Sequence, residues 1–172
     1  PWAEVPHCGL DDVDRAVDAA HKAFVKGPWP SMTASARGKL LRRLGDLIER
    51  DAARLAEIEV KDNGKLLAEM AGQVRYMAEW FHYFGGLADK IEGGVIPTDK
   101  PDMFTYTKRE PLGVVVCITP WNSPLLLLTW KLAPALAAGN TIVIKPSEFT
   151  SCSTLAFMDL IAEAGFPQGV VN

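Results

Sequence analysis

The sequence predicts an α/β fold: N-terminal helices, an extended strand excursion, and then a Rossmann-like βαβα unit built on a parallel sheet. Two apolar runs without charges, residues 112–118 and 141–144, are rich in β-branched side chains, which is typical of parallel strands covered on both faces. A helix-like segment follows each run after a short connection that contains proline. Such connections form right-handed βαβ units, whose ligands bind at the carboxyl ends of the strands.

Four helices are expected in the first half of the chain. Asp11 or Asp12 can cap the first, and both charges suit its positive end. A glycine- and proline-rich break separates it from the second helix, which starts near Thr33. The third helix ends at Gly64 and the fourth around Gly85. The apolar residues that recur at helical spacing are, in chain order, Val13, Ala16, Val17, Ala20 and Phe24; Ala36, Leu40, Leu44, Leu47 and Ile48; Leu55 and Ile58, with Glu59 beside them; and Met70, Val74, Met77, Phe81 and Phe84.

Residues 93–110 are expected to leave the helical part as extended chain. Gly93, Gly94 and Pro97 interrupt helical periodicity, and residues 104–109 alternate like a half-exposed strand. A strand of this kind at a sheet edge can pair with another chain. The segment therefore predicts a contact between subunits.

Local signals set the boundaries of the βαβα unit. Pro124 can open the helix after the first strand, and Gly139 ends it. Thr150 or Ser151 can cap the next helix. The apolar residues within 169–172 are typical of the beginning of another strand.

Composition narrows the class of protein. The 172 residues are 48% hydrophobic, enough for one buried core, and carry a net charge of −3. Basic residues are interspersed with acids, which argues against a nucleic-acid partner. No apolar run is long enough to cross a bilayer, and three cysteines without metal-like spacing fit a reducing compartment. We expect a cytoplasmic protein with no membrane partner and no metal.

Polar side chains follow both predicted strands. The amide of Asn122 can donate to an oxygen that gains negative charge, as in an oxyanion hole, although an asparagine before Ser-Pro is also a common turn former. Lys145 and Glu148 can bond the hydroxyls of an adenosine ribose, although such a pair commonly forms a surface ion pair. We expect Asn122 and Glu148 to face a common cavity shaped for an adenosine-containing coenzyme.

A series of motifs in this sequence resembles the aldehyde dehydrogenase superfamily. A single tripeptide would be weak evidence, but the whole series in the family's order and spacing is not expected by chance. The series comprises Asp12-Val13-Asp14-Arg15-Ala16-Val17, Gly27-Pro28-Trp29, Asp62-Asn63-Gly64-Lys65, Glu110-Pro111-Leu112-Gly113-Val114, Pro120-Trp121-Asn122, Trp130-Lys131-Leu132-Ala133-Pro134-Ala135-Leu136, Gly139-Asn140-Thr141, Lys145-Pro146-Ser147-Glu148 and Glu163-Ala164-Gly165-Phe166-Pro167.

The resemblance implies an NAD-dependent enzyme that oxidises an aldehyde to a carboxylic acid through a cysteine thiohemiacetal. It divides the chain into a helical part of the cofactor-binding domain (1–92), a strand segment of the oligomerisation sheet (93–110) and a dinucleotide-binding core (111–172). It also implies a homodimer or homotetramer. The family's nucleophilic cysteine and general-base glutamate have no counterpart here, so this chain alone is expected to be inactive.

The resemblance also assigns site residues. Asn122 would stabilise the thiohemiacetal oxyanion, while Glu148 would repel a 2′-phosphate by on the order of a few kcal/mol at close range and so favour NAD over NADP. No Gly-x-Gly-x-x-Gly follows the first strand, and Trp121, implied as a coenzyme contact, is as readily a core aromatic. The implied coenzyme contacts are Ile118, Thr119, Pro120, Trp121, Lys145, Ser147 and Glu148.

Three residues, Ser123, Leu127 and Trp130, fall along one side of the helix that follows Asn122. By the resemblance they line the channel through which the aldehyde enters. Many relatives have an aromatic residue in place of Ser123, so we expect a wider channel that admits a bulkier or more polar aldehyde. Packing of this helix against the sheet explains Leu127 and Trp130 equally well.

Two other classes of protein compete with this interpretation. One is a non-catalytic module that binds nucleotide or associates with other subunits through residues 104–109. The other is a thiol hydrolase that uses Cys152, in the first turn of a helix, but no histidine stands near it in sequence. Cys117 lies within an apolar strand and is interpreted as inert core.

Overall fold

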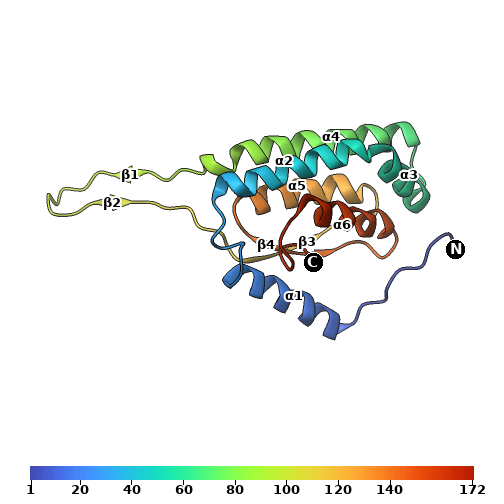
Figure 1. Ribbon diagram of the computed structural model, residues 1–172, viewed down its shortest axis with the longest axis horizontal. Coiled ribbons are helices and arrows are strands. Elements are labelled where there is room, and N and C mark those ends of the chain that lie inside the picture. Colours follow the sequence, from blue (N-terminus) through green and yellow to red (C-terminus); the bar gives the residue numbers. More distant parts are fainter.

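Helices cover both faces of a small parallel sheet in the computed structural model, which describes residues 1–172 (Figure 1). The elements are α1 (Leu10–Val25), α2 (Ala34–Arg50), α3 (Ala52–Asn63), α4 (Leu67–Leu87), η1 (Ala88–Lys90), β1 (Val95–Ile96), β2 (Thr105–Tyr106), β3 (Val114–Ile118), α5 (Pro124–Ala137), β4 (Thr141–Lys145) and α6 (Cys152–Ala164). One face of β3 and β4 carries α5 and the helices beyond it, and α1 packs against the other face. The predicted order of helices, strand excursion and βαβα unit is confirmed.

The N-terminal helices begin as local signals allow, with one correction. The hydroxyl of Thr33 accepts a hydrogen bond from the backbone N–H of Ala36 at 3.2 Å and so caps α2, as predicted. The predicted caps of α1, Asp11 or Asp12, are wrong because Gly9 is the N-cap. Asp12 lies in the first turn, where its carboxylate accepts the Gly9 N–H at 2.9 Å. A carboxylate at this position satisfies a free N–H as well as a cap would.

One continuous hydrophobic core joins the helical layer to the sheet. It runs from α2 and α4 through α5 to β4, and its fully buried members include Leu44, Ile48, Phe81, Leu132 and Ile142. The first helix contributes less than its apolar stripe predicts, because only Ala20 of α1 is buried while Val13 stays 51% exposed. The helix nevertheless contacts both β3 and β4.

The sheet has the parallel topology that the sequence predicts. β3 and β4 pair in register from Val114 opposite Thr141 to Ile118 opposite Lys145. Val171 forms a parallel bridge with Ile142, which confirms the predicted strand start near the end of the chain. β4 therefore lies between β3 and Val171.

The predicted burial of both strands on both faces is correct only for β4. In β3, Cys117 is fully buried, but Val116 is 54% and Ile118 63% exposed. β3 is the outer strand of the sheet in this chain, and α1, which packs against this face, leaves these two side chains uncovered. An uninterrupted apolar run therefore did not require cover on both faces here.

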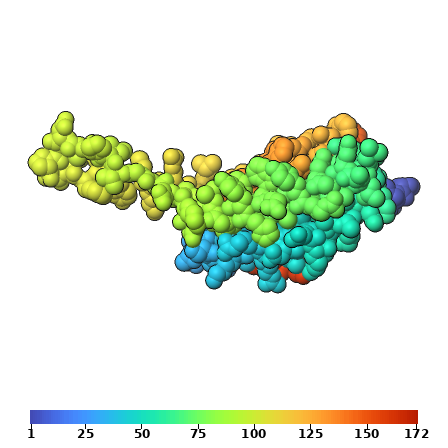
Figure 2. Space-filling view, turned by 90° about the horizontal axis from the view of Figure 1, so that it is seen from above, coloured from blue at the N-terminus to red at the C-terminus, as the bar shows by residue number.

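The strand excursion forms an arm of two antiparallel strands that projects away from the helices (Figures 1 and 2). Val95 pairs with Tyr106 and Ile96 with Thr105, so only part of the strand predicted over 104–109 is regular. Val95, Phe104 and Tyr106 are 70%, 74% and 62% exposed. We call residues 93–110 the arm.

Candidate coenzyme and oxyanion site

Two loops leave the carboxyl ends of the paired strands side by side. Because Ile118 lies opposite Lys145, residues 119–123 and 146–151 emerge from the same edge of the sheet. The backbone N–H of Thr119 donates to the Lys145 carbonyl at 3.2 Å. The Thr150 hydroxyl donates to the Trp121 carbonyl at 3.1 Å. These contacts hold the two loops together, so a ligand lying across the edge can meet side chains from both.

The first loop presents Asn122 to solvent. Its side chain is exposed and neither donates nor accepts a hydrogen bond within the chain. A turn-forming asparagine would accept a nearby backbone N–H through its side-chain oxygen. Asn122 makes no such bond, so its amide N–H groups are available to an incoming oxygen.

The second loop presents Lys145 and Glu148. Their charged atoms lie 3.5 Å apart, with side chains 61% and 71% exposed, so the surface ion pair considered from sequence does form. Hydrogen bonding to its own backbone N–H, followed by the charge of Lys145, lowers the pKa of Glu148. An exposed ion pair is worth little energy, so a ligand can separate the two groups at small cost. Glu148 is ionised at neutral pH and can accept hydrogen bonds from hydroxyls.

The remaining predicted coenzyme contacts divide between surface and interior. Ile118, Pro120 and Trp121 are exposed, and at 55% exposure Trp121 is not a core aromatic, so that alternative is wrong. Thr119 is buried. Ser147 is also buried, and its hydroxyl accepts the Phe149 N–H at 3.3 Å, which shapes the second loop. The exposed members are apolar and come from the end of β3 and from the first loop.

The predicted channel residues lie at the N-cap of α5 or on the helix itself, and they differ in exposure. Ser123 is buried, and its hydroxyl accepts a hydrogen bond from the Lys65 ammonium at 3.5 Å. Leu127 is half-buried. Trp130 is 44% exposed, and its ring centroid lies 5.9 Å from that of Trp80 on α4. Packing against α4 therefore accounts for part of the Trp130 surface.

Two cavities of this chain lie elsewhere. One of about 430 Å³ opens between α1 and the segment after α6, lined by Lys22, Lys26 and Trp29 among others. A second of about 200 Å³ lies beside Arg37 and Asp89. Neither contains Asn122, Lys145 or Glu148, so these two cavities do not supply the common hollow that we expected around Asn122 and Glu148.

Neither cysteine of the βαβα unit is suited to act as a nucleophile. Burial raises the pKa of the Cys117 thiol. Burial, together with a hydrogen bond to Asp62, raises the pKa of Cys152 to about 11, so its place in the first turn of α6 does not favour the thiolate. The structure has no group of three His, Cys, Asp or Glu side chains able to hold a metal ion. None of its helices could cross a membrane.

Thiol alkylation should therefore separate the three cysteines. A raised thiol pKa leaves the thiolate scarce until the pH approaches that value, so at pH 8 we expect exposed Cys8 to react first, and Cys117 and Cys152 to remain unmodified. Reaction of Cys152 should rise as the pH approaches about 11. Peptide mapping after timed alkylation measures each rate. Modification of Cys152 at pH 8 as fast as that of Cys8 would contradict this assignment.

Two carboxylates behind the loops were not predicted as site residues. Glu59, which is fully buried, accepts the backbone N–H of Leu125 at 3.0 Å, and Asp62 accepts the N–H of Cys152 at 2.8 Å. The sequence held one signal for them, since a glutamate beside the apolar stripe of a helix is rarely buried without a partner. Nothing in the sequence indicated which partner that would be.

The aldehyde dehydrogenase family model matches residues 1–172. The chain is 54% identical over 171 residues to (Z)-2-((N-methylformamido)methylene)-5-hydroxybutyrolactone dehydrogenase of Acinetobacter baylyi, covering 99% of this chain and 35% of that protein. It is 48% identical over 170 residues to betaine aldehyde dehydrogenase of Bacillus subtilis, with the same two coverages. The chain thus spans about a third of the length of the curated relatives it matches.

Solved structures carry the same fold. A variant of betaine aldehyde dehydrogenase from Staphylococcus aureus in complex with NAD+ matches 94% of this chain and 33% of its own, with a TM-score of 0.91 and 44% identity. An NAD-dependent aldehyde dehydrogenase from Sinorhizobium meliloti matches 97% of this chain and 33% of its own, with a TM-score of 0.94 and 40% identity. Sequence and fold agree along the whole chain, which belongs to the aldehyde dehydrogenase family.

Proposed function

We propose that this chain is the coenzyme-binding part of an NAD-dependent aldehyde dehydrogenase. The observation that carries the proposal is the pair of linked loops at the carboxyl ends of β3 and β4, which present Asn122 from one loop and Lys145 and Glu148 from the other. The NAD+ complex of the Staphylococcus aureus relative and the NAD dependence of the Sinorhizobium meliloti relative support the choice of coenzyme.

The residues present fit an adenosine ribose. Lys145 and Glu148 offer a donor and an ionised acceptor within one turn of chain, and both are exposed enough to turn toward a ligand. Exposed Ile118 and Trp121 beside them offer apolar contact to a ring. When bound, NAD+ accepts a hydride from the substrate. The protein's part at this edge is to hold the coenzyme across the two loops.

Asn122 performs the chemical role at this edge. When a cysteine from another part of the protein attacks an aldehyde carbon, the carbonyl oxygen gains negative charge. The free Asn122 amide can donate to that oxygen, and it stabilises the charged form more than the neutral carbonyl. A glutamate, also from elsewhere in the protein, would then activate the water that releases the carboxylic acid.

The proposal is tested with the full-length protein that contains this chain. Incubation with NAD+ and a panel of aldehydes of increasing size should produce NADH and the matching carboxylic acids, detected by absorbance and by mass spectrometry. The 172-residue chain alone should show no turnover, because Cys117 and Cys152 are held as thiols. If the full-length protein forms no NADH with any aldehyde, the proposed function is wrong.

Changing Glu148 to glutamine should weaken the preference for NAD+ over NADP+. The carboxylate repels the 2′-phosphate of NADP+, so removing its charge should raise the NADP+/NAD+ ratio of kcat/KM by roughly 10-fold to 100-fold. Asp159→Asn, which removes an exposed charge from α6, is the matched control and should leave the ratio unchanged. Initial rates with both coenzymes at saturating aldehyde give the two values. An unchanged ratio in E148Q would place Glu148 outside the coenzyme site.

A second candidate function, subunit association without catalysis, is favoured by the arm. Its exposed apolar residues Val95, Phe104 and Tyr106 and its free strand edges suit pairing with another copy. The two candidate functions are compatible, because a dehydrogenase can also assemble into the homodimer or homotetramer that we propose. Light scattering on the full-length protein tests association, and NADH formation separately tests catalysis.

We also propose a cytoplasmic location, in line with the mouse relative named aldehyde dehydrogenase, cytosolic 1, which is 52% identical over 163 residues.

A further inference from the structure

The helices that follow the two site loops are capped by side chains that lie far away in sequence. Ser123 and Ser151 are the N-caps of α5 and α6, yet neither side chain accepts a hydrogen bond from its helix. The first turn of a helix leaves free backbone N–H groups that require acceptors. In this chain α3 supplies one acceptor to each helix, 66 residues away in sequence for α5 and 90 for α6.

The two acceptors lie one turn apart on α3. Oε1 of Glu59 accepts the Leu125 N–H at 3.0 Å, and Oδ2 of Asp62 accepts the Cys152 N–H at 2.8 Å. Both carboxylates face helix N-termini, where negative charge is favoured. Since Asn122 lies three residues before Leu125, and Glu148 four before Cys152, each cap anchors the far end of one site loop.

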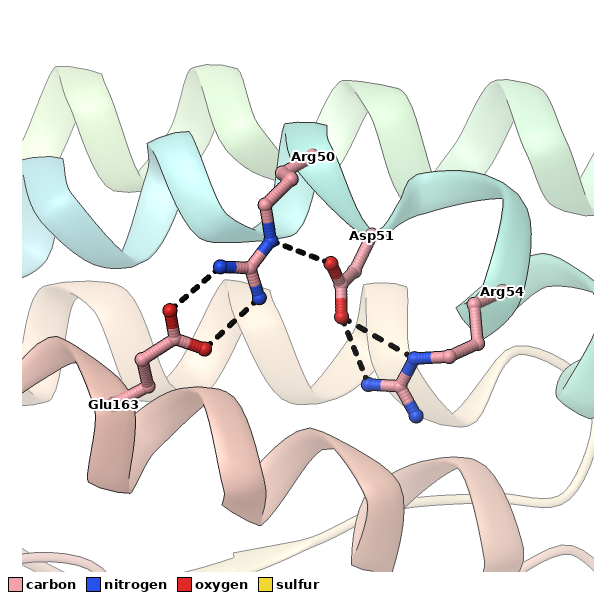
Figure 3. A network of polar contacts seen from close by, with 4 residues as sticks. All are labelled: Arg50, Asp51, Arg54 and Glu163. Carbon is pink, nitrogen blue, oxygen red and sulfur yellow. Dashed lines mark hydrogen bonds and ion pairs between the residues drawn. The ribbon is translucent and has the colours of Figure 1, made fainter.

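The α3 helix is itself braced against α6 at its other end (Figure 3). Arg50 forms two hydrogen bonds with Glu163 of α6, at 2.6 and 2.9 Å, and a third with Asp51 at 2.7 Å. Asp51 is the N-cap of α3 and also accepts two hydrogen bonds from Arg54. These bonds restrain α3 at its start, while Asp62 restrains it near its end.

We propose that Glu59 and Asp62 are positioning residues, with Glu59 holding the loop that carries Asn122 and Asp62 holding the loop that carries Lys145 and Glu148. The proposal rests on the proposed dehydrogenase function. It predicts that removing each carboxylate has a different effect on the reaction, because one loop bears the oxyanion donor and the other bears the ribose contacts. The Glu59 carboxylate is buried, and its second oxygen, Oε2, has no hydrogen-bond partner. A helix cap with a purely structural role would not require a buried oxygen without a partner.

The electrostatic surroundings of Glu59 agree with this role. Burial raises its pKa, opposed by the Leu125 N–H and by the charge of Lys65. Lys65, two residues after the end of α3, in turn donates to Ser123 at 3.5 Å, so the first loop is held both from α3 and from the segment that follows it. Exposed groups on the same helix, such as Glu57, take no part in these contacts.

The kinetic test uses the full-length protein, with NAD+ and an aldehyde that it oxidises. Glu59→Ala should lower kcat on the order of 10-fold to 100-fold with little change in the KM for NAD+, because misplacing a catalytic group slows the reaction. Asp62→Ala should raise the KM for NAD+ roughly 10-fold, the loss expected from one or two hydrogen bonds, with kcat little changed. Glu57→Ala is the control and should match the unsubstituted protein.

Conservative variants separate positioning from general destabilisation. Glu59→Gln and Asp62→Asn keep the acceptor oxygen and should recover most of the lost activity. Glu59→Asp keeps the charge but is one methylene too short to reach Leu125, so it should behave like E59A and stands in for that variant should it fail to fold. The proposal would be overturned if the Glu59 and Asp62 variants changed kcat and KM by the same factors. It would also be overturned if E59D were as active as E59Q.

Hydrogen exchange distinguishes failure of this inference from failure of the proposed function. If the unsubstituted full-length protein shows no activity, the dehydrogenase assignment fails. Hydrogen exchange still measures whether Glu59 and Asp62 anchor the two loops. E59A should then speed amide exchange selectively in residues 119–125, and D62A selectively in 146–152. Uniform acceleration over both loops would refute separate anchoring.

Discussion

Changing Asn122 to alanine should lower kcat by about 10²- to 10³-fold, the loss seen when one donor of an oxyanion hole is removed. The side chain is exposed and has no hydrogen-bond partner within the chain, so the substitution breaks no contact of the free protein. It should therefore leave stability and the KM for NAD+ nearly unchanged. Steady-state rates of the full-length protein with a good aldehyde substrate give both constants.

Asn122→Asp supplies the matched control for this prediction. It keeps the shape of the side chain but replaces the donor by a negative charge, which repels the developing oxyanion. The aspartate variant should therefore be no faster than the alanine variant. Retention of more than a tenth of the original kcat by N122A would show that another group stabilises the oxyanion.

Changing Trp29 to alanine should destabilise the chain by about 3–5 kcal/mol, the usual cost of removing a large buried aromatic. Trp29 is 1% exposed, its indole N–H donates to the Gly139 carbonyl at 3.0 Å, and its ring lies 6.1 Å from that of Phe166. It thus joins the connection between α1 and α2 to the end of α5. Its loss would leave a large cavity where three parts of the chain meet.

Urea denaturation followed by circular dichroism measures this effect. Trp29→Phe keeps a ring but loses the N–H donor, so it should cost less, about 1–2 kcal/mol. Trp2→Ala, at a half-exposed position, should be near neutral. A cost for W29A no larger than that for W29F would mean that the surroundings of Trp29 collapse onto the space it leaves.

Local signals predicted most of the architecture because they depend on neighbours in sequence. Thr33 and Ala36 are three residues apart, and the strand start near Val171 follows from apolar residues next to one another. The cap of α1 was wrong by two or three residues because a carboxylate near the start of a helix can act either as the N-cap or, as Asp12 does, from the first turn by accepting the N–H of the N-cap residue, here Gly9. Boundaries shift easily when two neighbouring residues can do the same work.

Exposure and long-range contacts were harder to predict. An apolar run such as β3 indicates a strand, but whether Val116 and Ile118 are covered depends on which elements pack beside it. The arm was expected as one strand, while its partner β1 is only two residues long and has no period to detect. Glu59 and Asp62 reach helices far along the chain, and such pairings have no pattern within a single sequence.

The sequence by itself determined the order of elements, the family, and the candidate residues Asn122, Lys145 and Glu148, because periodicity, turn chemistry and motif spacing are properties of neighbouring residues. Only the tertiary structure decided that the Thr150 hydroxyl links the two loops, that Trp121 lies at the surface, and that the Cys152 thiol is held protonated. Those facts depend on packing, on solvent exposure and on the charge of Asp62 placed 90 residues away in sequence. Distances between elements arise only when the chain folds, so they could not be predicted from local pattern.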